Sequence, residues 1–278
     1  TVLSVANAAE SPTVLLARRE MQSWRLLHLE PSALRSPDSF TASVELGEDG
    51  SSLAATLYRL THSKEGGDPS FVYGQVANRL ANLIQEIQEI WVDRDDQREL
   101  LTVQAKNFDG TVHPARSLSD GSLRFLALAV MELYPHLQCI LCLEEPENGI
   151  HPERIPAMLQ LLQDICTDTN LSVGVDNPLR QVIINTHSPS VVAQVPEQSL
   201  LVAGIKEIIK NEKRFHGAFF GCLSLTWRAE GKGRDLVSKG ELLAYLNPIL
   251  TETREEGLPK RVIDRKDMQN LLQGPLDF

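Results

Sequence analysis

Residues Cys139 to Pro152 read Cys-Ile-Leu-Cys-Leu-Glu-Glu-Pro-Glu-Asn-Gly-Ile-His-Pro. A short apolar run leads to two adjacent carboxylates, Glu144 and Glu145, and Pro146 then ends the regular backbone. A continuous apolar run of this length is typical of a strand buried on both faces in a parallel sheet. Acids at the carboxyl end of such a strand lie at the edge where open α/β sheets bind ligands. The stretch therefore predicts either a ligand-binding strand end or a solvated acidic turn.

Length and charge limit the classes of protein that the rest of the chain allows. The 278 residues suffice for one large domain or two small ones, and the net charge of −10 gives no bulk attraction to DNA or acidic lipid. Any nucleic-acid contact therefore needs a local basic patch. The best candidate is interleaved with Glu207 and Glu212, which favours a solvated face. Its members are Lys206, Lys210, Lys213, Arg214 and His216.

No apolar run is long enough to cross a membrane, and Thr1 to Glu10 lack the charged start and apolar core of a signal peptide. We therefore expect a cytoplasmic protein with no membrane partner. Cys139 and Cys142 lie three apart in the predicted strand, where side chains point to opposite faces, so shared metal binding is not expected. They are interpreted as reduced core residues.

Patterns before the acidic strand predict a mixture of strands and helices. An apolar run from Trp24 to Leu29 indicates a strand, and the spacing from Leu53 to Leu60 indicates a helix. Apolar positions from Val76 to Trp91 follow a helical period, so we expect one amphipathic helix that ends in water at Asp93 to Asp96. Two strands, Leu100 to Lys106 and Gly110 to His113, are expected to pair around a turn at 107–110.

A polar segment, Leu118-Ser119-Asp120-Gly121-Ser122, directly precedes an apolar helix from Leu123 to Leu133. Ser119 and Asp120 are good N-cap residues, so an ordinary capped helix explains the segment. The same hydroxyl and unpaired backbone N–H groups, with a glycine that permits close approach, also suit an anion site. The pattern alone leaves both interpretations open.

The second half of the chain predicts further alternation of strands and helices. A β-branched strand, Gln181 to Asn185, is followed by Thr186-His187-Ser188-Pro189, where His187 is either structural or catalytic. Helices are expected at Pro152–Cys166 and at Ser188–Val195. A further helix is expected within Ser238–Leu250, ending at Pro248. Strands are expected at Ser199–Gly204 and Gly221–Trp227, with the charged region between them.

Three phrases in fixed order carry a family resemblance: Ser119 to Phe125, Glu145 to Pro152 and Asn185 to Pro189. They resemble the carboxyl-terminal half of an ABC-type ATPase head, within the AAA-ATPase-like group that includes the RecF, structural-maintenance-of-chromosomes (SMC) and overcoming-lysogenisation-defect families. The resemblance covers roughly residues 45 to 200. It implies an α/β, P-loop NTPase-like fold, with a mainly parallel sheet flanked by helices and an antiparallel accessory portion.

The resemblance also implies three regions. Residues 1–115 would be the remainder of an amino-terminal lobe with a helical insertion, 116–200 the ATPase core, and 201–278 carboxyl-terminal strands, a helix and a charged tail. Glu144 matches the Mg²⁺-binding position, Glu145 the catalytic glutamate and His187 the switch histidine. Nucleotide-binding positions are matched by Ser119, Gly121 and Ser122 of the signature motif, and by Asn148 and His151 of the loop that reaches across a dimer.

The chain departs from the family pattern at three places. No Gly-Lys-Ser or Gly-Lys-Thr occurs, so we expect the amino-terminal strand and phosphate loop to be supplied by a segment before Thr1 or by another chain. Glu144 stands where many relatives have Asp, which allows a metal contact through water. Asp120 replaces a glycine and would place a negative charge near a phosphate.

The resemblance implies an ATP- and Mg²⁺-dependent ATPase, provided that the phosphate loop is supplied. It would form a homodimer around ATP as a nucleotide-gated switch. It would control an effector or nuclease partner in phage defence or DNA repair, with DNA as a further partner. One alternative is a binding or scaffold module of the same fold that has lost turnover. Another is a nuclease that uses Glu144, Glu145 and His151 as metal ligands.

Overall fold

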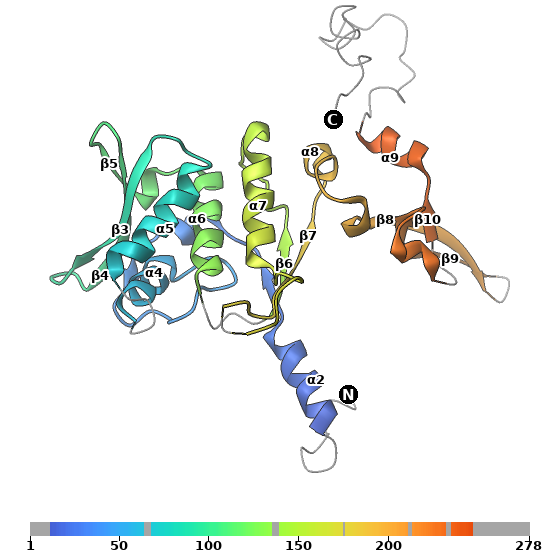
Figure 1. Cartoon of the computed structure of the whole chain (residues 1–278), viewed down its shortest axis with the longest axis horizontal. Helices are drawn as coiled ribbons and strands as arrows, with labels where there is room; N and C mark the ends of the chain where they lie inside the picture. Colours follow the sequence, from blue (N-terminus) through green and yellow to red (C-terminus); the bar gives the residue numbers. More distant parts are fainter. Residues whose placement is uncertain are drawn as a thin grey trace, which may run out of the picture. The chain divides into compact units, whose positions relative to one another are not determined.

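Three parallel strands form the sheet that ends in the two glutamates (Figure 1). The computed structural model describes residues 12–63, 68–134, 139–174, 176–210, 213–231 and 235–246. The strand order is β1 (Arg25–Leu27), β6 (Ile140–Glu144) and β7 (Gln181–Asn185). The register pairs Leu26 with Cys142, and Cys142 with Ile183. The predictions of strands in these three segments are confirmed.

The two faces of the parallel sheet differ in burial. Leu27, Leu141 and Leu143 are at most 4% exposed and join the main core. On the opposite face, Leu26 is 63% exposed and Ile183 is 56% exposed. Parallel sheets are ordinarily covered on both faces. Among the described residues, this sheet is therefore covered on one face only.

An antiparallel sheet forms the second sheet of the same unit. Its order is β2 (Asp38–Ser39), β4 (Leu100–Asn107) and β3 (Ile87–Asp95), and β5 (Val112–Pro114) also pairs with β4. The predicted pairing around the 107–110 turn is confirmed by the β4–β5 register. The fold class is thus the expected one, an α/β fold with a parallel sheet flanked by helices and an antiparallel portion.

The single helix predicted from Val76 to Trp91 is wrong in its second half. Helix α5 (Pro69–Ala81) begins earlier, capped by Asp68, and β3 starts at Ile87 and includes Asp93 to Asp95. A register shift between Ile87 and Glu89 moves the buried positions of β3 out of strict alternation. Buried residues therefore continue the helical spacing by coincidence, and the sequence pattern could not separate the two elements.

Helices fill the space between the two sheets. Helix α6 (Asp120–Glu132) packs against α5 on one side and α7 (Ile155–Ile165) on the other. Its burial is almost complete, and each large apolar side chain buried in this way contributes about 1.5–3 kcal/mol. The remaining helical elements of this unit are α2 (Pro12–Ser23), α3 (Pro31–Arg35), α4 (Leu53–His62), η1 (Ala115–Ser117), η2 (Pro152–Arg154), α8 (Pro189–Val192) and η3 (Glu197–Ser199).

Two buried polar residues fix the ends of helices. Asp38 on β2 accepts a hydrogen bond from the Ala55 amide at 2.9 Å and so caps α4, whose own N-cap residue makes no side-chain bond. Burial raises the pKa of Asp38. Arg180, 5% exposed, donates to the Glu132 carbonyl at 2.9 Å and thereby satisfies the end of α6.

The chain divides into two compact units, Thr1–Leu200 and Leu201–Phe278. In the second, β8 (Val202–Lys210) and β9 (Lys213–Leu223) form a hairpin, and β10 (Asp235–Val237) pairs with β9 in parallel. The strands predicted at 199–204 and 221–227 are therefore misplaced, because the hairpin includes the charged region. Helix η4 (Trp227–Glu230) replaces part of the second predicted strand, and α9 (Lys239–Leu246) matches the predicted helix up to the last described residue.

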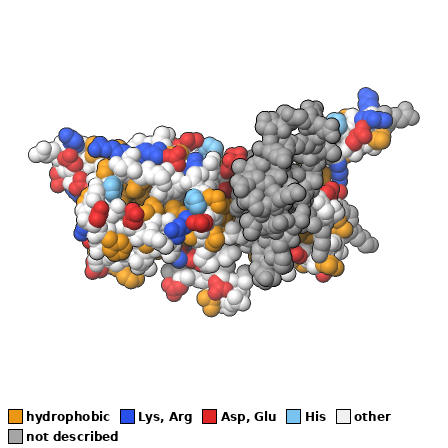
Figure 2. All heavy atoms as spheres, turned by 90° about the horizontal axis from the view of Figure 1, so that it is seen from above, with side chains coloured by type: hydrophobic (Ala, Val, Ile, Leu, Met, Phe, Trp, Pro, Cys, Tyr) orange, Lys and Arg blue, Asp and Glu red, His pale blue; other side chains and the backbone are white. Residues whose placement is uncertain are grey.

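The candidate basic patch lies on this hairpin, where its charges are partly paired. Lys206 binds both carboxylate oxygens of Asp235 at 2.6–2.7 Å, and Arg214 lies 3.4 Å from Glu207. Figure 2 shows acidic and basic side chains intermixed over the described atoms that it presents. The prediction of a solvated charged face agrees with these contacts.

None of the helices in the described part of the chain has the length and hydropathy needed to span a membrane. All four cysteines are free, and Cys139 is buried. Burial raises the pKa of the Cys139 thiol, which keeps it protonated. Cys139 is therefore a core residue as predicted, whereas Cys142 is half-buried and pairs with Leu26 and Ile183 on the less covered face of the sheet.

Candidate functional site

The two glutamates differ in backbone and surroundings, although they are adjacent. Glu144 ends β6, and one of its carboxylate oxygens lies 3.6 Å from His28 Nδ1. Glu145 has a positive φ of 44°, and its amide donates to the Asn185 carbonyl on β7 at 2.8 Å. A left-handed backbone at a non-glycine residue costs about 1–3 kcal/mol and is typical of functional sites. The turn therefore holds the two carboxylates in different directions.

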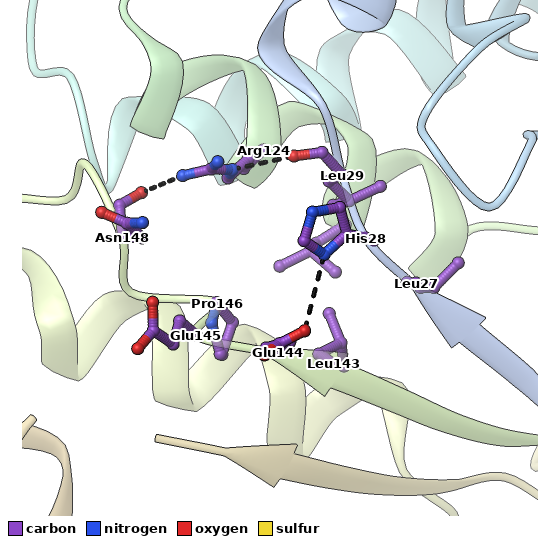
Figure 3. Close-up of a pocket in the computed structure, with 10 residues that line it drawn as sticks. Leu27, His28, Leu29, Arg124, Leu143, Glu144, Glu145, Pro146 and Asn148 are labelled. Carbon is purple, nitrogen blue, oxygen red and sulfur yellow. Dashed lines mark hydrogen bonds and ion pairs between the residues drawn. The ribbon is translucent and has the colours of Figure 1, made fainter. Parts of the chain in front are cut away.

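A cavity of about 130 Å³ opens beside Glu144 and Glu145 (Figure 3). Its walls come from the end of β1, the middle of α6, the end of β6 and the loop that follows β6. His28 and Glu144 face each other across it, and Glu145 and Asn148 lie on its loop side. The predicted Mg²⁺ and catalytic positions therefore share one cavity, together with one of the predicted nucleotide-binding residues.

Arg124 closes the wall of the cavity between β1 and this loop. Its Nε donates to the Leu29 carbonyl at 3.0 Å, and its Nη1 donates to the Asn148 carbonyl at 2.6 Å. These bonds use the guanidinium to hold two backbone segments. Arg124 is thus a structural clamp at the cavity, and its fork is directed at carbonyl oxygens rather than at an open phosphate position (Figure 3).

The predicted signature segment forms the N-terminus of α6 and contacts the loop after β6. Ser119 is the N-cap, with its hydroxyl accepting from the Ser122 amide at 3.2 Å and bonded to the Ser122 hydroxyl at 2.6 Å. Gly121 is buried so closely that a Cβ placed on it would lie 2.3 Å from the Gly149 carbonyl oxygen. The segment is therefore both a capped helix start and a close partner of the 148–151 loop.

The negative charge of Asp120 is balanced within the chain. Arg35, at the end of α3, forms an ion pair with Asp120 and also donates to the Leu118 carbonyl at 3.1 Å. This arginine fixes the segment just before α6. The expected repulsion between Asp120 and a phosphate is therefore reduced by a cation that the sequence pattern did not reveal.

The remaining predicted residues lie outside the cavity. His187 follows β7 and is exposed, and His151 is an exposed N-cap whose Nδ1 accepts from the Glu153 amide at 3.4 Å. Neither lines the cavity, nor do Ser119, Gly121 and Ser122. The structure thus brings together Glu144, Glu145 and Asn148, places the signature glycine against the same loop, and leaves the two histidines at the surface.

Four residues of the site were missed by sequence reasoning: His28, Arg35, Arg124 and Glu147. Arg35 and Arg124 act on segments far from them in sequence, so no local pattern marks them. Glu147 was read only as part of a family phrase, although it is 9% exposed. A charged residue between a proline and a turn gives no sign of burial.

The donor set at the end of β6 suits Mg²⁺ in part. Mg²⁺ is commonly held by one or two carboxylates together with phosphate oxygens and waters, and Glu144 and Glu145 are carboxylates that line one cavity. Among the described residues, no group of three or more His, Cys, Asp or Glu side chains is arranged to hold a metal ion. The three-ligand nuclease site of Glu144, Glu145 and His151 is therefore not assembled.

Comparison with known proteins gives one family. The family described as "AAA domain, putative AbiEii toxin, Type IV TA system" matches residues 10–193, about two thirds of the chain. No curated protein matches the sequence.

Among solved structures, the SMC head domain with a coiled coil and joint from Pyrococcus yayanosii is 12% identical, with a TM-score of 0.35. It is matched over 55% of this chain and 27% of its own. The SMC head of Pyrococcus furiosus with an extended coiled coil, bound to the C-terminal domain of ScpA, is 10% identical over 53% of this chain and 34% of its own, with a TM-score of 0.33.

A third structure comes from work on ATP-driven dimerisation and DNA-stimulated activation of SMC ATPases. It is 11% identical over 72% of this chain and 99% of its own, with a TM-score of 0.41. The chain thus spans about a third or less of the length of the first two SMC structures.

Proposed function

The chain belongs to the AAA-domain family of putative AbiEii toxins of type IV toxin–antitoxin systems, and from this premise we propose that it is an ATPase head that closes as a dimer around ATP and Mg²⁺. The observation that carries the proposal is the pair Glu144 and Glu145 at the end of a parallel strand, lining one cavity. In this proposal, closure and reopening of the dimer gate an effector subunit, and DNA is a further partner.

The chemistry follows from the positions of the side chains. Mg²⁺ would neutralise charge on the phosphate oxygens, and Glu144 would hold it directly or through water. Glu145 would accept hydrogen bonds from the attacking water and orient it. Ser119, Gly121 and Ser122 start a helix of 13 residues, whose N-terminal amides favour an anion, and they would contact the nucleotide of the partner subunit together with Asn148 and His151. His187 would donate to the transferred phosphoryl group.

Among the residues that the structure describes, the parallel sheet has an open edge at which a strand carrying the phosphate-binding loop, whose Gly-Lys-Ser/Thr motif is not found in this sequence, could pair. In the described part of the chain, β7 pairs with β6 and leaves its other edge open, beside the exposed face of Leu26 and Ile183. A strand added in parallel to β7, with its crossover helix over this face, would bury both. The loop between them would reach the carboxyl edge near Glu144 and Asn185. We propose that this unit carries the phosphate loop.

The test uses the protein purified from its natural source, with a peptide map that establishes whether a Gly-Lys-Ser or Gly-Lys-Thr peptide accompanies these 278 residues. Glu145→Gln keeps the size of the side chain and removes its carboxylate charge. We expect ATP hydrolysis to fall about 10²–10⁴-fold, and ATP with Mg²⁺ to trap a dimer in light scattering. Glu197→Gln, an equal change at an exposed residue of η3, is the control. Hydrolysis at the wild-type rate in Glu145→Gln would contradict the role.

The absence of a Gly-Lys-Ser/Thr motif favours one competing function, a nucleotide-insensitive binding module of the same fold. Isothermal titration with ATP and Mg²⁺ separates the two. If ATP binding disappears when the added strand, phosphate loop and crossover helix are removed, and returns when they are put back, the ATPase head is supported. A preparation that carries the motif peptide and still binds no ATP would support the binding module.

A further inference from the structure

Glu147 is a buried acid that the proposed chemistry does not use. Its side chain is 9% exposed, and its Oε1 accepts a hydrogen bond from the Thr186 hydroxyl. Its Oε2 is buried and has no hydrogen-bond partner within the described ranges. A buried carboxylate oxygen without a partner is costly to folding, so packing alone does not explain an acid here. The bond to Thr186 is the contact that the acid provides.

Thr186 connects Glu147 to the segment that contains His187 through a second hydrogen bond. The Thr186 hydroxyl accepts a hydrogen bond from the Ser188 amide at 3.0 Å while it donates to Glu147. The Ser188 carbonyl in turn accepts from the amides of Val191 and Val192, both at 3.1 Å, at the start of α8. A hydroxyl that donates to a fixed carboxylate has its lone pairs oriented toward the amide. The turn at His187 is therefore held by a bond that originates at Glu147.

The other contacts of the Glu147 loop lead to α6. The Asn148 amide donates to the Glu145 carbonyl at 3.0 Å, and the Ile150 amide donates to the Glu147 carbonyl at 2.9 Å. The Asn148 carbonyl is held by Arg124, and Gly149 lies against Gly121. The loop that contains Glu147 thus touches the N-terminus of α6 through its backbone and the His187 segment through one side chain.

We propose that Glu147 is a positioning residue that ties the segment 186–192 to the loop 145–151, so that the His187 turn, this loop and the start of α6 move as one body. The coupling itself is a property of the apo chain. Its effect on catalysis rests on the proposed ATPase function, because only there do Glu145 and His187 act on the same phosphoryl group.

Amide hydrogen exchange of the full chain without nucleotide tests the coupling. In Glu147→Ala and in Thr186→Val, the amides of Ser188, Val191 and Val192 should exchange about tenfold faster or more, because the turn loses its anchor. Thr186→Ser keeps the hydroxyl and should restore exchange to within about twofold of wild type. Glu197→Gln supplies the matched control for loss of a carboxylate. Glu147→Gln keeps a hydrogen-bond acceptor but loses the charge, so its amide exchange rates should lie between those of wild type and Thr186→Val. This variant replaces Glu147→Ala if Glu147→Ala does not fold.

The most specific measurement is amide exchange in the loop 145–151 when Thr186, the other partner of the hydrogen bond, is replaced. Thr186→Val should also accelerate exchange of the Asn148 and Ile150 amides, which it does not touch, because Glu147 loses its partner. The proposal would be overturned if the Ser188 amide exchanged at the wild-type rate both in the Glu147 variant and in the separate Thr186→Val variant. It would also be overturned if amide exchange were accelerated only in the segment 186–192 or only in the loop 145–151.

An activity measurement separates this proposal from the proposed function. In protein that hydrolyses ATP, Glu147→Ala should lower kcat at least tenfold with KM changed less than threefold, and unchanged kcat would overturn the link to catalysis. If the wild-type protein hydrolyses no ATP, the proposed function fails, while the exchange experiment still decides whether Glu147 couples the two segments.

Discussion

Replacing Gly121 by alanine tests the closest backbone contact in the candidate site. The new Cβ would lie 2.3 Å from the Gly149 carbonyl oxygen and 2.7 Å from its carbonyl carbon, whereas ordinary contact begins at 3.4 Å. The helix start and the loop must therefore separate by about 1 Å. Overpacking of this kind costs about 1–3 kcal/mol, and the better helix propensity of alanine returns up to about 1 kcal/mol. We expect a net loss of about 1–2 kcal/mol of unfolding free energy.

Gly74 provides the matched control, because it lies inside α5 and a Cβ there meets nothing within 4 Å. Gly74→Ala should therefore gain about 0.5–1 kcal/mol. Urea unfolding followed by tryptophan fluorescence compares the two variants with wild type. If Gly121→Ala were as stable as Gly74→Ala, the close approach of α6 to the loop would not exist in solution, and the inferred contact between signature segment and loop would be wrong.

Two further predictions concern ion pairs and protonation. Arg35→Ala and Asp120→Ala, combined in a double-mutant cycle, should show a coupling of about 0.5–1 kcal/mol that weakens at 1 M salt, as expected for a partly exposed pair; additive losses would refute the pairing. Burial raises the pKa of Asp38 above its ordinary 3.8, so the native state holds the proton more tightly than the unfolded state. Its contribution to stability should be complete below pH 3.8 and be lost as the pH rises through the native pKa. Asp38→Asn should flatten this part of the profile of unfolding free energy against pH, and an unchanged profile would show that Asp38 is not the group responsible.

Local patterns were sufficient where each residue acts on its neighbours. The strand that ends at Glu144 could be predicted because Pro146 stops an apolar run. The start of α6 could be predicted because Ser119 caps the helix by accepting from the amide of Ser122, three residues later. The same reasoning failed for β3, where the register shift between Ile87 and Glu89 hides the alternation. It also missed α2, none of whose residues is buried in the structure.

Contacts between distant segments had no local signal. Arg124 joins carbonyl groups at Leu29 and Asn148, and Glu147 meets Thr186 only when β6 and β7 lie side by side. Charged side chains are mostly exposed, so Arg35 at a helix end and Glu147 in a loop are first interpreted as surface residues. The candidate carboxylates could be named from the sequence, while the groups that position them required the fold.

The order of strands in the parallel sheet has a consequence for synthesis of the protein. β1 leaves the ribosome more than a hundred residues before its partner β6, whereas β8 and β9 are separated by only two residues of sequence. At about 5–20 residues per second, β1 waits on the order of 5–20 s with its apolar side chains unpaired. The hairpin of the second unit can form within microseconds of its emergence. The sheet edge that carries Glu144 and Glu145 therefore forms only after β6 has emerged, and a nascent chain that pauses between residues 27 and 140 exposes a strand that any open edge nearby could capture.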